Sequence, residues 1–202
     1  MVISEARIES WNPAMGLKLA PLVTLDDDQL FEFCQLNRDL RIERDAEGVL
    51  VLMAPAGGAS SARNLELCRQ LANWAHADGS GIAFDSSAGF ILPNGAIRSP
   101  DAAWVRRERW DGLSANQREK FVPLCPDFVV ELRSPSDRLS ALQRRLRELI
   151  RHGARLGWLI DPARRSVHVY RPGESVQTLL SPSTMSAEPL LPGFVLDLGI
   201  IL

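Results

Sequence analysis

Several features that would assign this chain to a special class of protein are missing from its sequence. The three cysteines, Cys34, Cys68 and Cys125, are odd in number and far apart, which excludes a Cys-x-x-Cys metal or redox motif and a disulfide framework. No apolar run approaches the roughly 18 residues of a membrane span. The first residues do not follow the basic and then apolar layout of a signal peptide. We therefore expect a cytoplasmic protein with reduced thiols.

Positive charge is unevenly distributed, and lysine contributes almost none of it. The formal net charge of −2 argues against a uniformly basic nucleic-acid binder. Residues 1–60 hold ten acids and five bases, whereas residues 133–155 hold seven arginines and two acids. Lys18 and Lys120 are the only lysines, against 21 arginines. An arginine-rich segment is compatible with phosphate contact, but it is also typical of a solvated helix face.

Length and composition fit one globular domain. The chain has 202 residues, of which 46% are hydrophobic and 24% charged, close to the average for a folded protein. Residues 1–23 contain Pro13 and Pro21 and little periodicity, so we expect a loosely ordered lead-in before a single domain over residues 24–202. Thr24 is expected to cap a first helix. A hairpin is predicted over residues 40–53, with a glycine in its turn.

The rest of the sequence alternates between helical and strand-like patterns. Helices are expected over residues 60–77, capped by Ser60, and over residues 138–152. The near-continuous apolar run at residues 126–132, which contains the acid Glu131 near its end, suits a strand buried on both faces. Other strands are expected at residues 82–84, 89–92, 97–105, 156–160, 167–170, 176–180 and 194–198. This order predicts a mixed α/β domain.

Four acids fall on or beside the predicted strands. They are Glu43 in the hairpin, Asp101 after Pro100, and Asp127 and Glu131 at the two ends of one strand. A carboxylate on a buried strand is costly unless it is paired, hydrogen-bonded or bound to a cation. Two carboxylates on neighbouring strands would repel each other, and that arrangement collects a hard divalent cation such as Mg²⁺.

Two arginines are candidates for a further positive charge at such a site. Arg133 would lie on the same face of its strand as Glu131, because side chains alternate with a period of two. On the following helix, Arg145 falls at the border of the apolar stripe, from which it can reach over the end of the sheet. The alternative is structural. Asp101 would cap a turn, and Glu131 would form an ion pair with Arg133 or with an arginine of the helix.

Several stretches of the sequence resemble a known group of nucleases. Pro100-Asp101 followed by Glu131-Leu132-Arg133 resembles the Pro-Asp…(Asp/Glu)-x-Lys signature, PD-(D/E)XK, of the restriction-endonuclease-like superfamily. Longer stretches resemble the Uma2 branch of that superfamily, and the resemblance extends over residues 25–200. These stretches are residues 98–102, 126–137, 153–162 and 190–194.

This resemblance implies a fold and a set of metal ligands. The implied fold is restriction-endonuclease-like, with a mixed central sheet flanked by helices and with additional β-hairpins. Asp101 and Glu131 would bind Mg²⁺ or Mn²⁺, and the Leu132 carbonyl would add a ligand. Glu43 corresponds to the acid in the family's first hairpin.

The same resemblance implies an activity, and it also marks a departure from the family pattern. The implied activity is Mg²⁺-dependent hydrolysis of phosphodiester bonds in DNA. The family's lysine corresponds to Arg145, so Arg145 would stabilise charge on the phosphate, with Arg133 as the lesser candidate. Arginine cannot give up a proton as a tuned lysine can. Two alternatives therefore stay open: a weakened or inactive nuclease-fold protein that binds nucleic acid, and a structural dimer. A nuclease that cuts both strands would also benefit from forming a homodimer.

Overall fold

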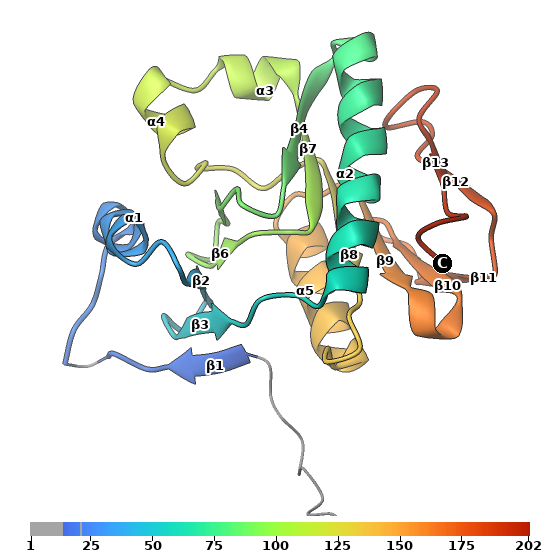
Figure 1. The fold of residues 1–202 in the computed structure, drawn as a ribbon. Helices are drawn as coiled ribbons and strands as arrows, with labels where there is room; N and C mark the ends of the chain where they lie inside the picture. Colours follow the sequence, from blue (N-terminus) through green and yellow to red (C-terminus); the bar gives the residue numbers. More distant parts are fainter. Residues whose placement is uncertain (1–13, 21) are drawn as a thin grey trace, which may run out of the picture.

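The centre of the molecule is a mixed β-sheet with a helix on each face (Figure 1). The structure, a computed structural model, describes residues 14–20 and 22–202. The strands of the central sheet are β4 (Gly81–Asp85), β7 (Ala102–Arg106), β8 (Phe128–Leu132), β9 (Leu156–Asp161), β10 (Ser166–Tyr170) and β11 (Gln177–Leu180). Their order across the sheet is β11-β10-β9-β8-β7-β4.

The middle of this sheet combines parallel and antiparallel pairing. Strands β8 and β9 run parallel and are joined by helix α5 (Leu139–Arg151), whereas β7 and β10 flank them in antiparallel pairs. A parallel pair requires such a crossover connection, which a helix supplies. Every residue of β8 is buried, which confirms the expectation from its apolar run.

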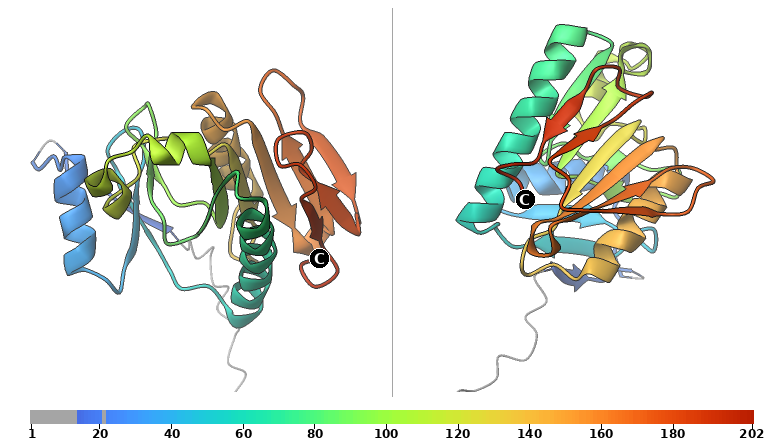
Figure 2. Two further views of the ribbon diagram at one scale, coloured as in Figure 1. Left: turned by 90° about the horizontal axis from the view of Figure 1, so that it is seen from above. Right: turned by 90° about the vertical axis from the view of Figure 1, so that its right-hand side faces the viewer.

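Helices α2 (Gly58–Asp78) and α5 cover opposite faces of the central sheet (Figure 2). Leu71 of α2 packs in the same core cluster as Phe128, whereas Leu146 of α5 packs in the cluster that contains Val129. Because successive side chains of a strand point to opposite faces, β8 contributes to both clusters. The crossover helix is thereby held against the sheet beside the end of β8.

A second sheet carries the predicted hairpin. Its strands are β1 (Ala14–Leu17), β2 (Arg41–Arg44), β3 (Leu50–Met53), β5 (Phe90–Ile91) and β6 (Ile97–Arg98), in the order β1-β3-β2-β6-β5. Strands β2 and β3 pair antiparallel, and Gly48 in their turn has a φ of 80°, as the hairpin prediction requires. Helix α1 (Asp27–Leu36) covers this sheet through Leu30, which packs against Ile42 and Leu50.

The predicted strand over residues 97–105 is in fact two strands in different sheets. Strand β6 ends at Arg98 and strand β7 begins at Ala102, so residues 99–101 cross from the second sheet to the central one. Pro100 has no N–H for a strand ladder. The Ser99 N–H instead donates to the Glu43 carboxylate at 2.7 Å. The break places Asp101 in the crossing segment, immediately before β7, rather than inside a strand.

Three other expectations about the elements need correction. The first helix is capped by Asp26, which accepts a hydrogen bond from the Gln29 N–H, and not by Thr24. Helix α2 begins at Gly58, with Gly57 as its N-cap, two residues before Ser60. Within the expected lead-in, β1 pairs with β3. Residues 1–13 and 21, including Pro13 and Pro21, lie outside the described residues.

The remaining elements lie at the two ends of the molecule. The polar segment between β7 and β8 contains two short helices, α3 (Arg107–Asp111) and α4 (Ala115–Glu119). A 3-10 turn, η1 (Pro162–Arg164), leads into β10. Strands β12 (Thr184–Ser186) and β13 (Val195–Asp197) pair near the C-terminus, and β12 was not expected from the sequence. Among the described residues, no helix has both the length and the apolar character needed to cross a membrane.

Candidate active site at the junction of the two sheets

Asp101, the residue immediately before β7, lies opposite Glu131 of β8. The antiparallel register pairs Ala102 with Val130, so one further step along each strand sets Asp101 opposite Glu131. Directly opposed residues of an antiparallel pair project from the same face. The Leu132 N–H donates to Asp101 Oδ2 at 2.8 Å and fixes the orientation of that carboxylate. The acids expected from the sequence are therefore neighbours at one end of the central sheet.

Arg145 of α5 contacts the acids of both sheets. Its Nε donates to Glu131 Oε1 at 2.5 Å, and its Nη1 and Nη2 donate to the two carboxylate oxygens of Glu43 at 2.5 Å. Nη2 also donates to the Ser99 carbonyl at 2.8 Å. The fork geometry of a guanidinium permits this combination of a bidentate pair with two further acceptors. The structure therefore places Arg145 at the acids, where the sequence expected it.

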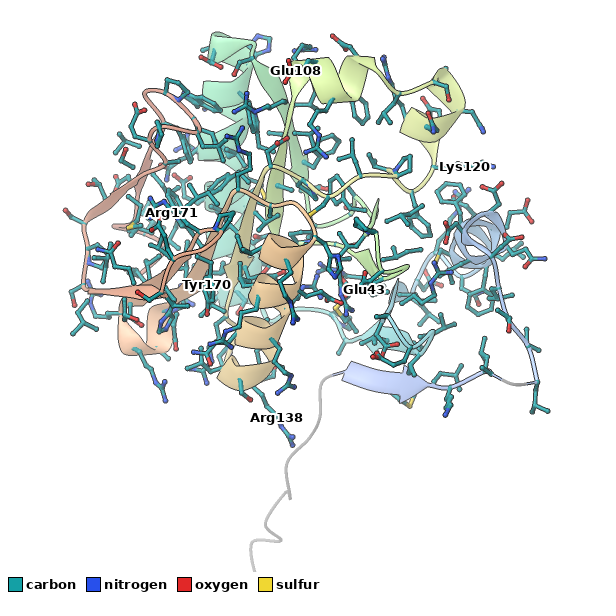
Figure 3. All side chains as sticks on the ribbon, turned by 180° about the vertical axis from the view of Figure 1, so that it is seen from behind. Glu43, Glu108, Lys120, Arg138, Tyr170 and Arg171 are labelled. Carbon is teal, nitrogen blue, oxygen red and sulfur yellow. The ribbon has the colours of Figure 1, made fainter. Side chains whose placement is uncertain are left out.

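Glu43 is the most deeply buried member of the group. Its side chain is only 1% exposed, although it belongs to a strand of the smaller sheet. Figure 3 shows Glu43 beside α5, on the face of the molecule that this helix covers. Besides Arg145, the carboxylate accepts the Ser99 N–H. It thus ties strand β2, the crossing segment and helix α5 together.

Three contacts around this group were not anticipated from the sequence. Arg98 lies 3.5 Å from Glu43 through Nη1 and donates from Nε to Glu148 Oε2 at 2.8 Å. The Asn94 side-chain amide donates to the other oxygen of Glu148 at 3.0 Å. Glu148 follows Arg145 by three residues and therefore lies on the same side of α5, which is the signal that would have found it.

Burial dominates the electrostatics of the two opposed acids. It raises the pKa of Glu131 to about 8, an effect that Arg145 opposes and that Asp101 and Glu43 reinforce. Burial also raises the pKa of Asp101, against the effect of the Leu132 amide and of Arg41 and Arg145. Negative charge at this place is thus costly, and a cation beside it is stabilising.

Arg145 stays charged under all ordinary conditions. Burial alone would lower the pKa of its guanidinium, but the carboxylates of Glu131 and Glu43 more than offset that effect and hold the pKa above its usual value. Arg145 therefore supplies a fixed positive charge and hydrogen-bond donors. It cannot exchange a proton during a reaction.

Arg133 and Asp127 belong to other ion pairs. Arg133 donates from Nη1 to Asp161, a completely buried acid of β9, at 2.7 Å. Its contact is therefore with Asp161 rather than with Glu131, the partner that the alternation along the strand suggested. Asp127, at the opposite end of β8, lies 2.9 Å from Arg109 of α3. Neither pair includes Arg145.

The oxygen ligands at the site are of the kind that a hard cation prefers. Two of the acids, Glu43 and Glu131, however, already form ion pairs with Arg145. Asp101 and Glu131 supply carboxylate oxygens, and Mg²⁺ requires only one or two protein carboxylates. However, among residues 14–20 and 22–202 no three His, Cys, Asp or Glu side chains are arranged so that they could hold a metal. Glu43 and Glu131 both face the guanidinium. A metal at Asp101 and Glu131 would therefore share Glu131 with Arg145.

The fold brings acids of both sheets to a single guanidinium, that of Arg145. The sequence profile of the Uma2 family, described as "Putative restriction endonuclease", matches residues 27–199. The chain therefore belongs to this family, as the sequence resemblance indicated. The mixed sheet with helices on both faces and additional small sheets confirms the expected fold class.

A solved structure agrees with this assignment. The chain is similar to a protein from Anabaena variabilis ATCC 29413, described as a putative nuclease belonging to DUF820, with a TM-score of 0.68 and 20% sequence identity. The match covers 79% of this chain and 88% of that chain, and at this identity it shows a shared fold. No curated protein sequence matches the chain.

Proposed function

We propose that this protein is a metal-dependent endonuclease that hydrolyses phosphodiester bonds in DNA. The observation that carries the proposal is the placement of Asp101 opposite Glu131, with Arg145 in contact with Glu131. Two carboxylates and one cation at the end of a sheet provide both the ligands for a divalent metal and a positive charge for a phosphate. The Uma2 family membership supports this choice of reaction.

Each residue of the cluster has a distinct part in this proposal. Asp101 and Glu131 would hold Mg²⁺ or Mn²⁺, which when bound polarises a phosphate oxygen and lowers the pKa of a bound water. The Leu132 N–H orients Asp101, and the Leu132 carbonyl is a further candidate ligand. Arg145 donates to Glu131, and a guanidinium binds phosphate oxygens in bidentate fashion and stabilises their charge.

The surface around α5 supports DNA as the substrate. Helix α5 carries Arg145 on its inner side and exposed arginines on its outer side, and Figure 3 shows Arg138 at its N-terminal end. Such a surface binds the phosphate backbone without reading its sequence. The exposed arginines at or next to the helix are Arg138, Arg144, Arg147, Arg151 and Arg155.

A plasmid-cleavage assay tests the proposed reaction. Supercoiled plasmid is incubated with the protein and either Mg²⁺, Mn²⁺ or EDTA. We expect nicked and linear products with the metals only, and a loss of at least about 100-fold on Asp101→Asn or Glu131→Gln, which remove a metal-binding charge. The exposed Asp39 offers a matched control, since Asp39→Asn makes the same chemical change on the surface. Cleavage that persists in EDTA or in Asp101→Asn would refute the proposal.

One observation favours a second candidate function, a nucleic-acid-binding protein that retains the nuclease fold without cleavage. Arg145 stands where the family pattern has lysine, and its guanidinium is engaged by Glu43, Glu131 and Ser99. In that case the α5 surface would bind DNA, yet no metal would produce cleavage. A filter-binding assay run beside the plasmid assay separates the two candidates.

We further propose that the active form is a homodimer. Two copies related by a twofold axis would present one site to each strand of a duplex. Sedimentation equilibrium at micromolar concentration, with and without duplex DNA, tests this. A single monomeric species under both conditions would contradict it.

A further inference from the structure

We propose that Arg145 acts as a built-in counter-ion that competes with the divalent metal for Glu131, so that the free protein binds metal weakly. The inference rests on the proposed function, because it takes Asp101 and Glu131 as the metal ligands. It concerns the ligand-free state of the site rather than the chemical step. In this view Arg145 is a positioning residue that sets metal affinity.

The contacts of Arg145 leave its guanidinium little freedom. It donates four hydrogen bonds to Glu131, Glu43 and the Ser99 carbonyl, all between 2.5 and 2.8 Å. Its side chain is 16% exposed, and those of Glu43 and Glu131 are 1% and 5% exposed. Charge-assisted hydrogen bonds of this kind are strong when they are shielded from water. Arg145 is thus held in place by the same acids that a metal would need.

Charge balance gives the second step of the argument. The carboxylates of Glu43 and Glu131 face one guanidinium, and Asp101 lies opposite Glu131 with its carboxylate held by the Leu132 N–H. A divalent cation held by Asp101 and Glu131 would be attracted by both acids, but Arg145, which donates to Glu131 at 2.5 Å, would repel it. In a partly buried site this repulsion is weakly screened. Metal affinity therefore depends on the competition between the divalent cation and Arg145 for Glu131.

The shape of the cation distinguishes arginine from lysine at this position. A lysine ammonium is a single point charge with three donors, whereas the guanidinium spans Glu43 and Glu131 at once. A lysine at 145 would leave one carboxylate oxygen or more without a charged donor and would allow a metal to approach Glu131. The departure from the family's lysine thus affects metal binding before it affects catalysis.

Mn²⁺ binding measured without DNA tests the proposal. Isothermal titration calorimetry, and electron paramagnetic resonance of free Mn²⁺, are applied to the wild type and to Arg145→Met. Arg145→Gln is included as a milder change, because its neutral amide still hydrogen-bonds to the acids. We expect both variants to bind Mn²⁺ at least about tenfold more tightly than the wild type, since a unit charge close to a dication is removed. We also expect Mn²⁺ to raise the melting temperature of the variants more than that of the wild type.

The controls separate this inference from the proposed function. Arg144→Met removes the same charge from the exposed neighbour on α5 and should leave Mn²⁺ affinity within about twofold of the wild type. Adding Asp101→Asn to Arg145→Gln should abolish the gain. Equal Mn²⁺ affinity in the wild type and both variants, with loss on Asp101→Asn, overturns the counter-ion role and keeps the metal ligands. If neither the wild type nor any variant binds Mn²⁺, or if binding is unaffected by Asp101→Asn, both the counter-ion role and the assignment of the metal ligands are overturned.

Discussion

Replacing Glu43 by glutamine tests whether the acid cluster holds the two sheets together. Glu43→Gln keeps the size of the side chain and the acceptor for the Ser99 N–H. It removes the negative charge and turns an amide NH₂ towards Arg145, which already donates to both oxygens of the carboxylate. It also removes the negative charge that lies 3.5 Å from Arg98, which keeps its ion pair with Glu148.

The expected loss of stability follows from the burial of this pair. Glu43 is 1% exposed and Arg145 16% exposed, so water cannot replace the lost contacts freely. Removing one partner of a buried ion pair costs about 3–5 kcal/mol. Arg145 keeps Glu131 as a partner, which reduces the loss, so we expect about 2–4 kcal/mol. That is a large share of the roughly 5–15 kcal/mol by which a domain is stable.

Urea denaturation followed by tryptophan fluorescence and circular dichroism measures the effect. The midpoint should fall with little change in the slope of the free energy against urea. Glu47→Gln is the matched control, because Glu47 is an exposed acid in the turn of the same hairpin, and we expect it to change stability by less than about 0.5 kcal/mol. A loss below about 1 kcal/mol for Glu43→Gln would refute the reasoning that this carboxylate is a structural tie.

Three further predictions address DNA, packing and thiols. The logarithm of the DNA affinity should fall against the logarithm of the salt concentration with a slope of about −3 to −5. Single alanine changes at Arg144, Arg147 or Arg151 should each make that slope shallower by about 1, and a salt-independent interaction would contradict this. Gly157→Ala should cost about 1–3 kcal/mol in urea unfolding, because the added Cβ would lie 2.6 Å from Cδ1 of the buried Leu146 and force that side chain to repack; unchanged stability would contradict it. Burial raises the pKa of the Cys125 thiol to about 12. Iodoacetamide at pH 8 should therefore label this thiol at least about tenfold more slowly in the native than in the urea-unfolded protein, and equal rates would contradict this.

The sequence allowed much of the central sheet to be predicted. The near-continuous apolar run that became β8, the amphipathic pattern of α5 and the glycine turn of the β2–β3 hairpin are local signals with clear physical causes. The division of the strands into two sheets is not local. It depends on the Ser99 N–H, which pairs with the Glu43 carboxylate instead of with a neighbouring strand.

The candidate site was predictable in part for the same reason. The position of Arg145 at the border of the apolar stripe correctly indicated contact with the acids. The distribution of partners depends on the tertiary structure: Arg133 pairs with Asp161, and Arg98 bridges Glu43 and Glu148. Pairs separated by 28 to 102 positions in the chain leave no trace in a periodic pattern.

The unequal number of contacts made by the acids has an evolutionary consequence. Glu43 and Glu131 form ion pairs with Arg145, so selection for a stable fold alone would retain them even in a descendant that lacks the proposed DNA cleavage. The Asp101 carboxylate makes fewer contacts: it accepts one hydrogen bond from the Leu132 amide and lies 4.0 Å from Arg41. Among relatives of this chain, the residue at position 101 should therefore be the first acid to drift when activity is lost, and its identity should report on cleavage better than that of the other two.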